Sequence, residues 1–182
     1  MPAADITLLT ATSETLAMLA DMLVETVAHG GSVSFMHPLA PEDAARFWAG
    51  ALAAAARGER QVFGAWDGPR LVGTVTLLLD LPPNQPHRAE LAKMMTRVSH
   101  RNRGIATALM QAAEAAALAA GRTLLVLDTA AEGGASVLYE RLGFTFAGEI
   151  PDYALKPYGG LTPTRLYWKR IGGFNCAPIV AI

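Results

Sequence analysis

A run of charged and small residues in the middle of the chain could bind a phosphate group. It lies between a strand-like stretch, residues 89–97, and a helical pattern, residues 104–120, and reads Arg101-Asn102-Arg103-Gly104-Ile105-Ala106. The first N–H groups of a helix are unpaired and attract anions, Gly104 permits close approach, and two arginines add charge. The run is not a Walker loop, since no Gly-Lys-Ser/Thr follows. Taken alone, it predicts either a phosphate site or an ordinary helix start with solvated arginines.

A second segment carries a tyrosine in a short helical pattern. It reads Ala135-Ser136-Val137-Leu138-Tyr139-Glu140-Arg141-Leu142-Gly143-Phe144. Ala135, Leu138 and Leu142 share one face of the helix. Tyr139 follows Ala135 by four residues, so its ring also points inward, toward a strand edge. By itself, the pattern is more typical of a core tyrosine with a hydrogen-bonded hydroxyl than of a catalytic one.

The rest of the sequence predicts a sheet that could bring these two segments together. The N-terminal half predicts a strand, a helix capped by Ser13, a second helix and a hairpin around Asp67-Gly68, at residues 6–9, 13–28, 41–57, 61–66 and 70–80. The C-terminal half alternates strands and helices before two late strands, at residues 89–97, 104–120, 123–127, 135–142, 144–149 and 164–169. This order predicts an α/β (α+β) fold, with a mixed sheet that contains one parallel crossover.

The composition is that of a folded domain and argues against several other classes. Of the 182 residues, 52% are apolar and 17% are charged, which is not typical of disorder. A net charge of −1 and scattered basic residues give no basis for binding nucleic acid or a membrane surface. Dispersed histidines and a single cysteine, Cys176, predict neither a metal site nor a disulfide. We expect one cytoplasmic domain over residues 1–182, with a core at 5–171, a tail at 172–182 and no signal peptide.

The two motifs and their order resemble a known superfamily. Residues 89–146 are similar to the core of the GNAT acetyltransferases. In this region a strand is followed by R-x-x-G-x-A, a helix, a second strand and the motif A-x-x-x-Y-E-R-L-G-F. Within that superfamily, the chain resembles the tabtoxin-resistance acetyltransferases. The segments that carry this resemblance are LVETVAHGGSVSFM, HRAELAKMM, LLVLDT and GEIPDYALKPYGGLTPTRLYWKRI. The resemblance implies the GNAT fold, a mixed, mostly antiparallel sheet flanked by helices. In it, two central parallel strands, here residues 89–97 and 123–127, splay apart.

The resemblance also implies acetyl-CoA as co-substrate, with no metal. The pyrophosphate would bind the backbone of residues 101–106, and the pantetheine arm would pair with the strand at Met94, Met95 and Thr96. An N–H near Met95 would polarise the acetyl carbonyl. Tyr139 corresponds to the tyrosine that protonates the departing thiolate. This protonation would raise the rate only modestly, because a thiol with a pKa of roughly 8.5 is a fair leaving group. An amine would attack directly in a ternary complex.

Two positions depart from the superfamily pattern. Val98 stands where a proline is usual, which predicts a looser turn before the phosphate loop. Glu132 lies near a position often filled by an asparagine that touches the cofactor, so the sequence does not predict that contact.

A base is needed to remove a proton from the attacking amine. An alkyl amine has a pKa of roughly 10.4, so its neutral form costs about 4.6 kcal/mol at pH 7. Glu90 opens one splayed strand and Asp128 directly follows the other, and the tabtoxin-resistance resemblance places a base that works through water on this pair. Asp80, at the end of the central strand, is a rival. Asp128 could instead cap a loop, and Glu90 could be a surface residue.

Loops outside these motifs are expected to form the acceptor pocket, at residues 30–36, 80–88 and 152–153. Phe35, Asp152 and Tyr153 in such a pocket would suit a compact cationic amine, and the resemblance extends this to an amino-acid-like toxin or antibiotic. The predicted function is N-acetylation of a small-molecule amine by a monomer or homodimer that binds neither nucleic acid nor membranes. Two alternatives remain, acetylation of protein or peptide amines and a CoA-binding sensor without turnover.

Overall fold

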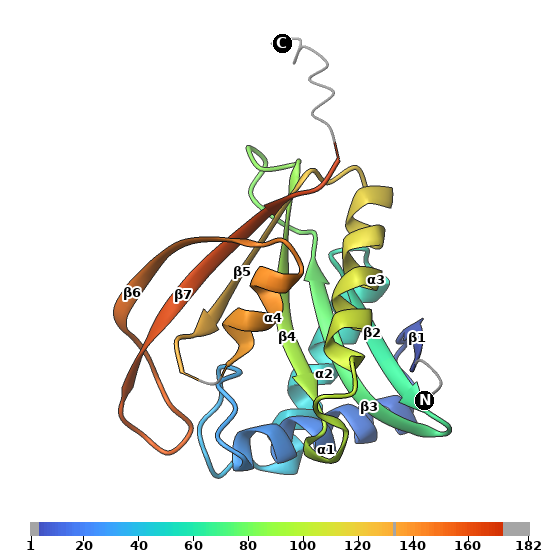
Figure 1. The fold of residues 1–182 in the computed structure, drawn as a ribbon. Coiled ribbons are helices and arrows are strands. Elements are labelled where there is room, and N and C mark those ends of the chain that lie inside the picture. The colour runs from blue at the N-terminus through green and yellow to red at the C-terminus, as the bar shows by residue number, and fades with distance from the viewer. Residues whose placement is uncertain (1–3, 133, 173–182) are drawn as a thin grey trace.

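A mixed sheet of seven strands carries helices on both faces (Figure 1). The computed structural model describes residues 4–132 and 134–172, so most of the predicted tail and Cys176 lie outside the described residues. The strand order is β1-β2-β3-β4-β5-β7-β6. The strands are β1 (Asp5–Leu8), β2 (Arg60–Asp67), β3 (Arg70–Leu78), β4 (Arg88–Thr96), β5 (Leu124–Ala130), β6 (Thr145–Leu155) and β7 (Leu161–Arg170). Neighbouring strands pair antiparallel except β4 and β5, which confirms the predicted mixed sheet with one parallel crossover.

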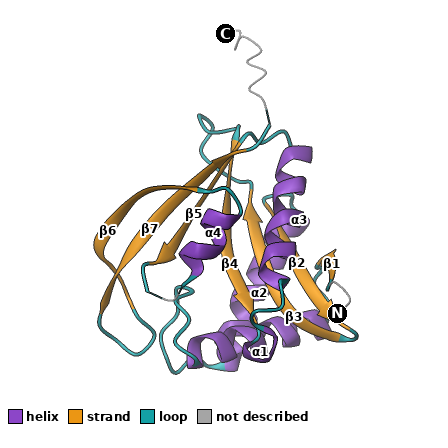
Figure 2. Ribbon diagram, viewed as in Figure 1, coloured by secondary structure: helices purple, strands orange, loops and turns teal. Residues whose placement is uncertain are grey.

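The helices form two layers around this sheet, each with its own apolar core (Figure 2). On one face, α1 (Ser13–Ala28) and α2 (Pro41–Ala56) bury Leu23 and Trp48 against β2, β3 and β4. On the other face, α3 (Ile105–Ala119) and α4 (Ala135–Arg141) bury Leu109 and Tyr139. In the described part of the chain, no helix is both long and apolar enough to cross a membrane.

The predicted cap of α1 is wrong by one residue. Thr12, not Ser13, has the extended backbone of an N-cap, and its Oγ1 accepts a hydrogen bond of 3.1 Å from the N–H of Thr15. Ser13 is already the first helical residue. Both residues have a hydroxyl that can cap a helix, so the sequence alone does not separate them.

The last two strands are longer than predicted, and residues 152–153 lie inside β6 rather than in a loop. The pairing of β6 with β7 continues past irregularities at Phe146/Gly148 and Ile150/Ala154. Most β6 side chains are exposed, so the strand lacks the apolar alternation by which a half-buried strand is recognised.

The parallel pair opens partway along its length. β4 and β5 are in register from Arg88 opposite Leu124 to Leu91 opposite Leu127. Beyond these positions β4 remains paired only with β3, while β5 remains paired only with β7. The two strands therefore separate toward their C-terminal ends, as the GNAT resemblance implies.

The start of α3 lies almost in contact with the backbone of β3 at Gly73. A Cβ atom at this position would lie 2.8 Å from Cγ2 of Ile105 and 3.2 Å from the backbone oxygen of Met95. Only a residue without a side chain permits this approach. Gly73 therefore fixes how closely the first turn of α3, and the loop before it, sit on the sheet.

We expect Gly73→Ala to lower the free energy of unfolding by roughly 1–3 kcal/mol, because the added methyl group overpacks this contact. Gly50→Ala is the matched control, since Gly50 is a helical glycine with open space around it. That change should raise the free energy of unfolding by about 0.5–1 kcal/mol. Urea unfolding of both variants measures the difference, and equal stabilities would contradict the close contact.

Candidate active site

The gap between β4 and β5 opens into a cleft of about 1410 Å³. Its lining comes from the C-terminal half of β4, the loop into α3, the end of β5, α4, residues 29–34 and the β6–β7 hairpin. Met94, Met95 and Thr96, the predicted pantetheine contacts, all line it. Figure 1 shows α4 and the start of α3 flanking this region.

One wall of the cleft is an unpaired strand edge. The N–H of Arg97 donates to the oxygen of Val72 at 2.9 Å and so points toward β3. Peptide groups alternate in direction along a strand, so the N–H and C=O of Thr96 point away from β3, toward the cleft. Among the described strands, none pairs with this edge beyond Leu91. Such an edge can bind an extended ligand that carries amide groups.

The predicted phosphate loop lies at the end of the same strand. After a short 3-10 turn (Val98–His100), Asn102 and Gly104 have positive φ values of 61° and 78°, and Gly104 is the N-cap of α3. No side chain caps this helix, so its first N–H groups have no side-chain partner. The cleft is lined by Arg101, Asn102, Gly104, Ile105 and Ala106. Arg103 is the one predicted loop residue outside this lining.

Tyr139 lies on the cleft wall with its ring buried. Its ring packs against Phe144 and Tyr167, and only 6% of the residue is exposed. Burial raises the pKa of Tyr139 to about 12, and the nearby carboxylate of Asp128 acts in the same direction, while a hydrogen bond with Thr129 opposes them. The phenol therefore keeps its proton at neutral pH.

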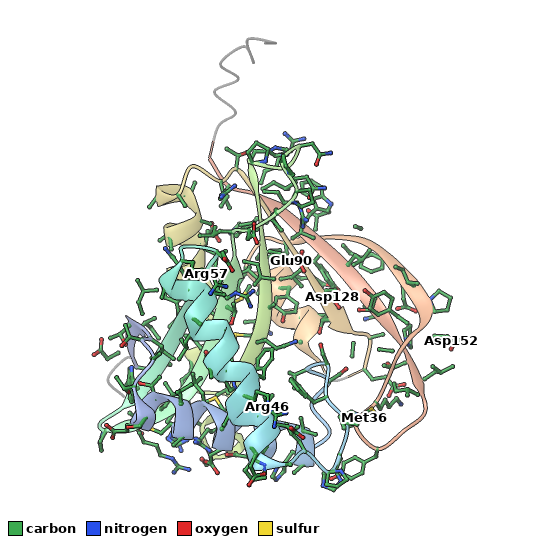
Figure 3. The ribbon with its side chains drawn as sticks, turned by 180° about the vertical axis from the view of Figure 1, so that it is seen from behind. Met36, Arg46, Arg57, Glu90, Asp128 and Asp152 are labelled. Atoms are coloured by element: carbon green, nitrogen blue, oxygen red, sulfur yellow. The ribbon has the colours of Figure 1, made fainter. Side chains whose placement is uncertain are left out.

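The structure places the two predicted base residues differently. Asp128 lines the cleft and accepts a hydrogen bond of 3.1 Å from Oγ1 of Thr164. Glu90 lies opposite Val126, two residues before Asp128, so both carboxylates are on one face of the sheet. Glu90 is at the closed end of the strand pair, is not among the cleft residues and is ion-paired with Arg88 at 3.1 Å. Figure 3 shows the two residues at different heights on this face.

Asp80 and the loop after it lie at the other end of the sheet. The N–H of Asp80 bonds to the oxygen of Glu59, before the start of β2. None of residues 80–88 lines the cleft. The expectation that this loop forms part of the acceptor pocket finds no support in the structure, because β4 carries the chain from that loop to the open end.

Comparison with known proteins agrees with this architecture. The model of the acetyltransferase (GNAT) family matches residues 25–144. The chain belongs to this family. The predicted class, an acetyl-CoA-dependent N-acetyltransferase, is thereby confirmed.

Solved structures share the GNAT fold over nearly the whole chain. An N-acetyltransferase from Staphylococcus aureus Mu50 superimposes with a TM-score of 0.76 at 19% identity, covering 92% of this chain and 99% of that one. The Salmonella typhimurium protein yncA, solved with its cofactor acetyl-CoA, gives 0.76 at 15% identity, with coverages of 96% and 98%. An aminoglycoside 6′-N-acetyltransferase complexed with coenzyme A gives 0.71 at 18% identity, with coverages of 93% and 98%.

Val98, which stands where the GNAT pattern usually has a proline, is fixed by a hydrogen bond to α1. Its N–H, which a proline would lack, donates to Oε1 of Glu25 at 2.9 Å. The other oxygen of Glu25 accepts a 2.6 Å bond from Nη1 of Arg97, which also reaches Asp21 at 2.8 Å. Nε of Arg97 donates to the oxygen of Leu71. These contacts join the start of the predicted phosphate loop to α1 and β3, so the predicted looser turn is not observed.

The predicted acceptor residues are only partly brought together. Tyr153 lines the cleft, but Phe35 packs its ring against Phe47 in the α1–α2 core, with 5.2 Å between the centroids. Asp152 is not among the cleft residues, and Figure 3 shows it at the outer edge of the β6 hairpin, away from Asp128. Residues 29–34 do line the cleft, as expected for part of that loop.

The far side of the cleft is bridged by contacts between this loop and the β6–β7 hairpin. Oη of Tyr158 donates to the oxygen of Ala28 at 2.7 Å, and the N–H of His37 donates to the oxygen of Pro157 at 2.8 Å. The rings of His37 and Tyr158 stack with centroids 4.4 Å apart. The side of the cleft where the acceptor is predicted to bind is therefore bordered by segments that hydrogen bonds join.

Two charged residues of the cleft wall had no role predicted from the sequence, although the resemblance placed Glu132 near a cofactor contact. Glu132 lines the cleft, where its carboxylate is 2.6 Å from Nζ of Lys156. Lys93, half-buried in β4, also lines it. The signal for Lys93 was present in the sequence, since it is a charged residue between the apolar residues of a central strand. It lies within the segment HRAELAKMM that carries the branch resemblance, but outside the two motifs to which the sequence assigns a role.

We expect Glu25→Ala to lower the free energy of unfolding by roughly 1–3 kcal/mol, because it leaves the Val98 N–H and part of Arg97 without an acceptor. Burial tends to raise the pKa of Glu25, but the Val98 N–H and Arg97 outweigh it, so this pKa lies below its ordinary value. The stabilisation is therefore present above the unfolded-state pKa of about 4.3 and is lost as pH falls through the lower folded value.

Urea unfolding at neutral and acidic pH measures this effect. Glu25→Gln is the matched variant, since it keeps an oxygen for the Val98 N–H and loses only the charge. At neutral pH, Glu25→Gln should lower the free energy of unfolding by less than Glu25→Ala does. A difference between the parent protein and Glu25→Ala that stays constant down to strongly acidic pH would contradict the assignment.

Proposed function

We propose that this GNAT enzyme transfers the acetyl group of acetyl-CoA to a primary amine of a small molecule, by direct attack in a ternary complex. The observation that carries the proposal is that Tyr139, whose pKa is raised by burial, and the carboxylate of Asp128 both lie on the walls of one cleft, beside an unpaired edge of β4. The described chain, 4–132 and 134–172, would act as a single domain.

The cleft supplies partners for each part of the cofactor. The free edge at Met94, Met95 and Thr96 suits the amides of a pantetheine arm, and the N–H groups at the start of α3, with Arg101, suit a diphosphate. When bound, acetyl-CoA supplies an activated thioester carbonyl. An N–H of β4 near Met95 would then polarise that carbonyl.

Two side chains would move protons during the transfer. Asp128 would accept the proton that the amine loses as its nitrogen bonds to the carbonyl carbon, directly or through a water. Tyr139 would donate its proton to the sulfur as the carbon–sulfur bond breaks. Glu90, on the same face but outside the cleft lining, would act only through a chain of water molecules.

The bridged acceptor side favours a small acceptor over a protein segment. The Tyr158–Ala28 and His37–Pro157 contacts join the two segments that border the cleft, so a polypeptide could not lie across it without breaking them. A compact amine needs no such opening. Within this class, the resemblance to tabtoxin-resistance acetyltransferases points to amino-acid-like toxins or antibiotics.

The proposal is tested by mixing the protein with acetyl-CoA, a thiol reagent and matched panels of small amines and lysine peptides. Release of free CoA that depends on a small amine supports it. Release with peptides alone would overturn the small-molecule assignment. If calorimetry detects CoA binding and the thiol reagent detects no release of CoA with any amine, a sensor without turnover would be favoured.

Tyr139→Phe should lower kcat by about 10²-fold, because the thiolate then leaves without a proton donor. The Kd for acetyl-CoA, measured by calorimetry, should stay nearly unchanged, since the phenyl ring keeps the packing against Phe144 and Tyr167. A large loss of acetyl-CoA binding would instead assign Tyr139 a structural role.

Asp128→Asn should lower kcat by about 10²-fold near neutral pH and should recover part of the rate as pH rises, because the amine then loses its proton in solution. Glu90→Gln is the matched variant on the same face of the sheet. We expect it to have the smaller effect, since Glu90 is paired with Arg88 outside the cleft lining. Equal effects would favour a base that works through water bound by both carboxylates, and an unmoved profile for Asp128→Asn would exclude Asp128.

A further inference from the structure

Lys93 is a cationic side chain directed into the cleft by an irregularity in β4. The pairing of β3 with β4 shifts register between Thr74 and Thr76, opposite Lys93 and Met94. Lys93 itself has a φ of +52°, which few residues other than glycine adopt. A bulge of this kind re-aims a side chain relative to its neighbours. As a result a central strand of the sheet presents an ammonium group at the point where β4 and β5 separate.

Among the described residues, the ammonium group of Lys93 contacts neutral side chains. Nζ donates to Oγ of Ser34 at 2.9 Å and lies 5.7 Å from the centroid of the Phe47 ring. None of the ion pairs within 4 Å among the described residues includes Lys93. By contrast, Lys156 and Lys169 each have a carboxylate at 2.6 Å.

Burial leaves this cation under-compensated. Removal from water lowers the pKa of Lys93, while the negative charge of Asp128 opposes that shift. A partly buried charge is stabilised when an opposite charge reaches it. The charge of Asp128 acts on the pKa of Lys93, but no ion pair within 4 Å joins the two among the described residues, so an anion brought by a ligand would give the ammonium group an oppositely charged partner.

We propose that Lys93 and Ser34 form an anion-binding subsite for the acceptor, which selects amines that also carry a carboxylate. Lys93 would hold the carboxylate and the Ser34 hydroxyl would help to orient it, while the amine of the same molecule lies toward Asp128 on the neighbouring strand. The opposite charges of Lys93 and Asp128 then match the two charges of an amino acid. The inference deepens the proposed function and rests on it.

The test compares each amino acid with its own carboxamide as acceptor, with rates corrected for the fraction of neutral amine. Glycine, alanine, glutamate and 4-aminobutyrate beside their amides make a suitable panel. We expect kcat/KM for the best acid to exceed that of its amide by roughly 10- to 100-fold, the range for a hydrogen bond to a charged group. Lys93→Met should remove this difference, and Lys93→Arg should keep part of it.

Lys169→Met is the control variant, because Lys169 pairs with Glu114 and is not among the cleft residues. It should keep the full preference for the acid. The KM for acetyl-CoA should be the same in both methionine variants. An amide used as well as its acid by the parent protein, or a preference that persists in Lys93→Met, would overturn the inference without touching the proposed transfer reaction.

A binding measurement decides the matter even if the panel contains no substrate. Calorimetry of the protein–CoA complex with N-acetylglycine, N-acetylalanine and their amides reports on the subsite directly. Tighter binding of an acid, lost in Lys93→Met, supports the inference, and equal or absent binding of acid and amide contradicts it. Failure of CoA itself to bind would instead refute the proposed function.

Discussion

The divergence of β4 and β5 is the constraint on which the rest of the site depends. Up to Leu91 and Leu127 the two strands share a parallel ladder, and beyond that point each keeps only its outer neighbour. A sheet that opens in its middle exposes backbone groups that would otherwise be paired. The Thr96 peptide group, Tyr139, Asp128 and Lys93 all lie at this opening, so every candidate chemical role arises from one break in hydrogen bonding.

An opened sheet needs contacts that keep the free strand in place. Arg97, with 4% of its surface exposed, supplies several at once, since it bonds to Leu71, Asp21 and Glu25. Glu25 in turn holds Val98. Where a proline would restrict the backbone by its ring, this chain uses a carboxylate on α1, and the result is a turn fixed by tertiary contacts instead of by local geometry.

The sequence predicted the order of elements, the single parallel crossover and the loop that opens α3, because these have strong local signals: buried apolar strands, a helix start and glycines. It did not predict the extent of β6, whose exposed side chains give no alternation. Pockets formed by distant segments were also poorly predicted. Phe35 packs in the α1–α2 core, and Glu90 lies at the closed end of the strand pair. The directions of these side chains depend on packing and strand register, which no short motif encodes.

The contacts between residues 28–37 and the β6–β7 hairpin connect the predicted acceptor side of the cleft to the strand that hydrogen-bonds to Asp128. β7 bears Thr164, whose hydroxyl bonds to Asp128, and the hairpin that ends in β7 is tied at its tip to Ala28 and His37. Residues 29–34, which border the cleft, are continuous with that tie. One hairpin therefore contacts both the loop that borders the cleft and the carboxylate on the opposite wall, so the two walls share a single structural support.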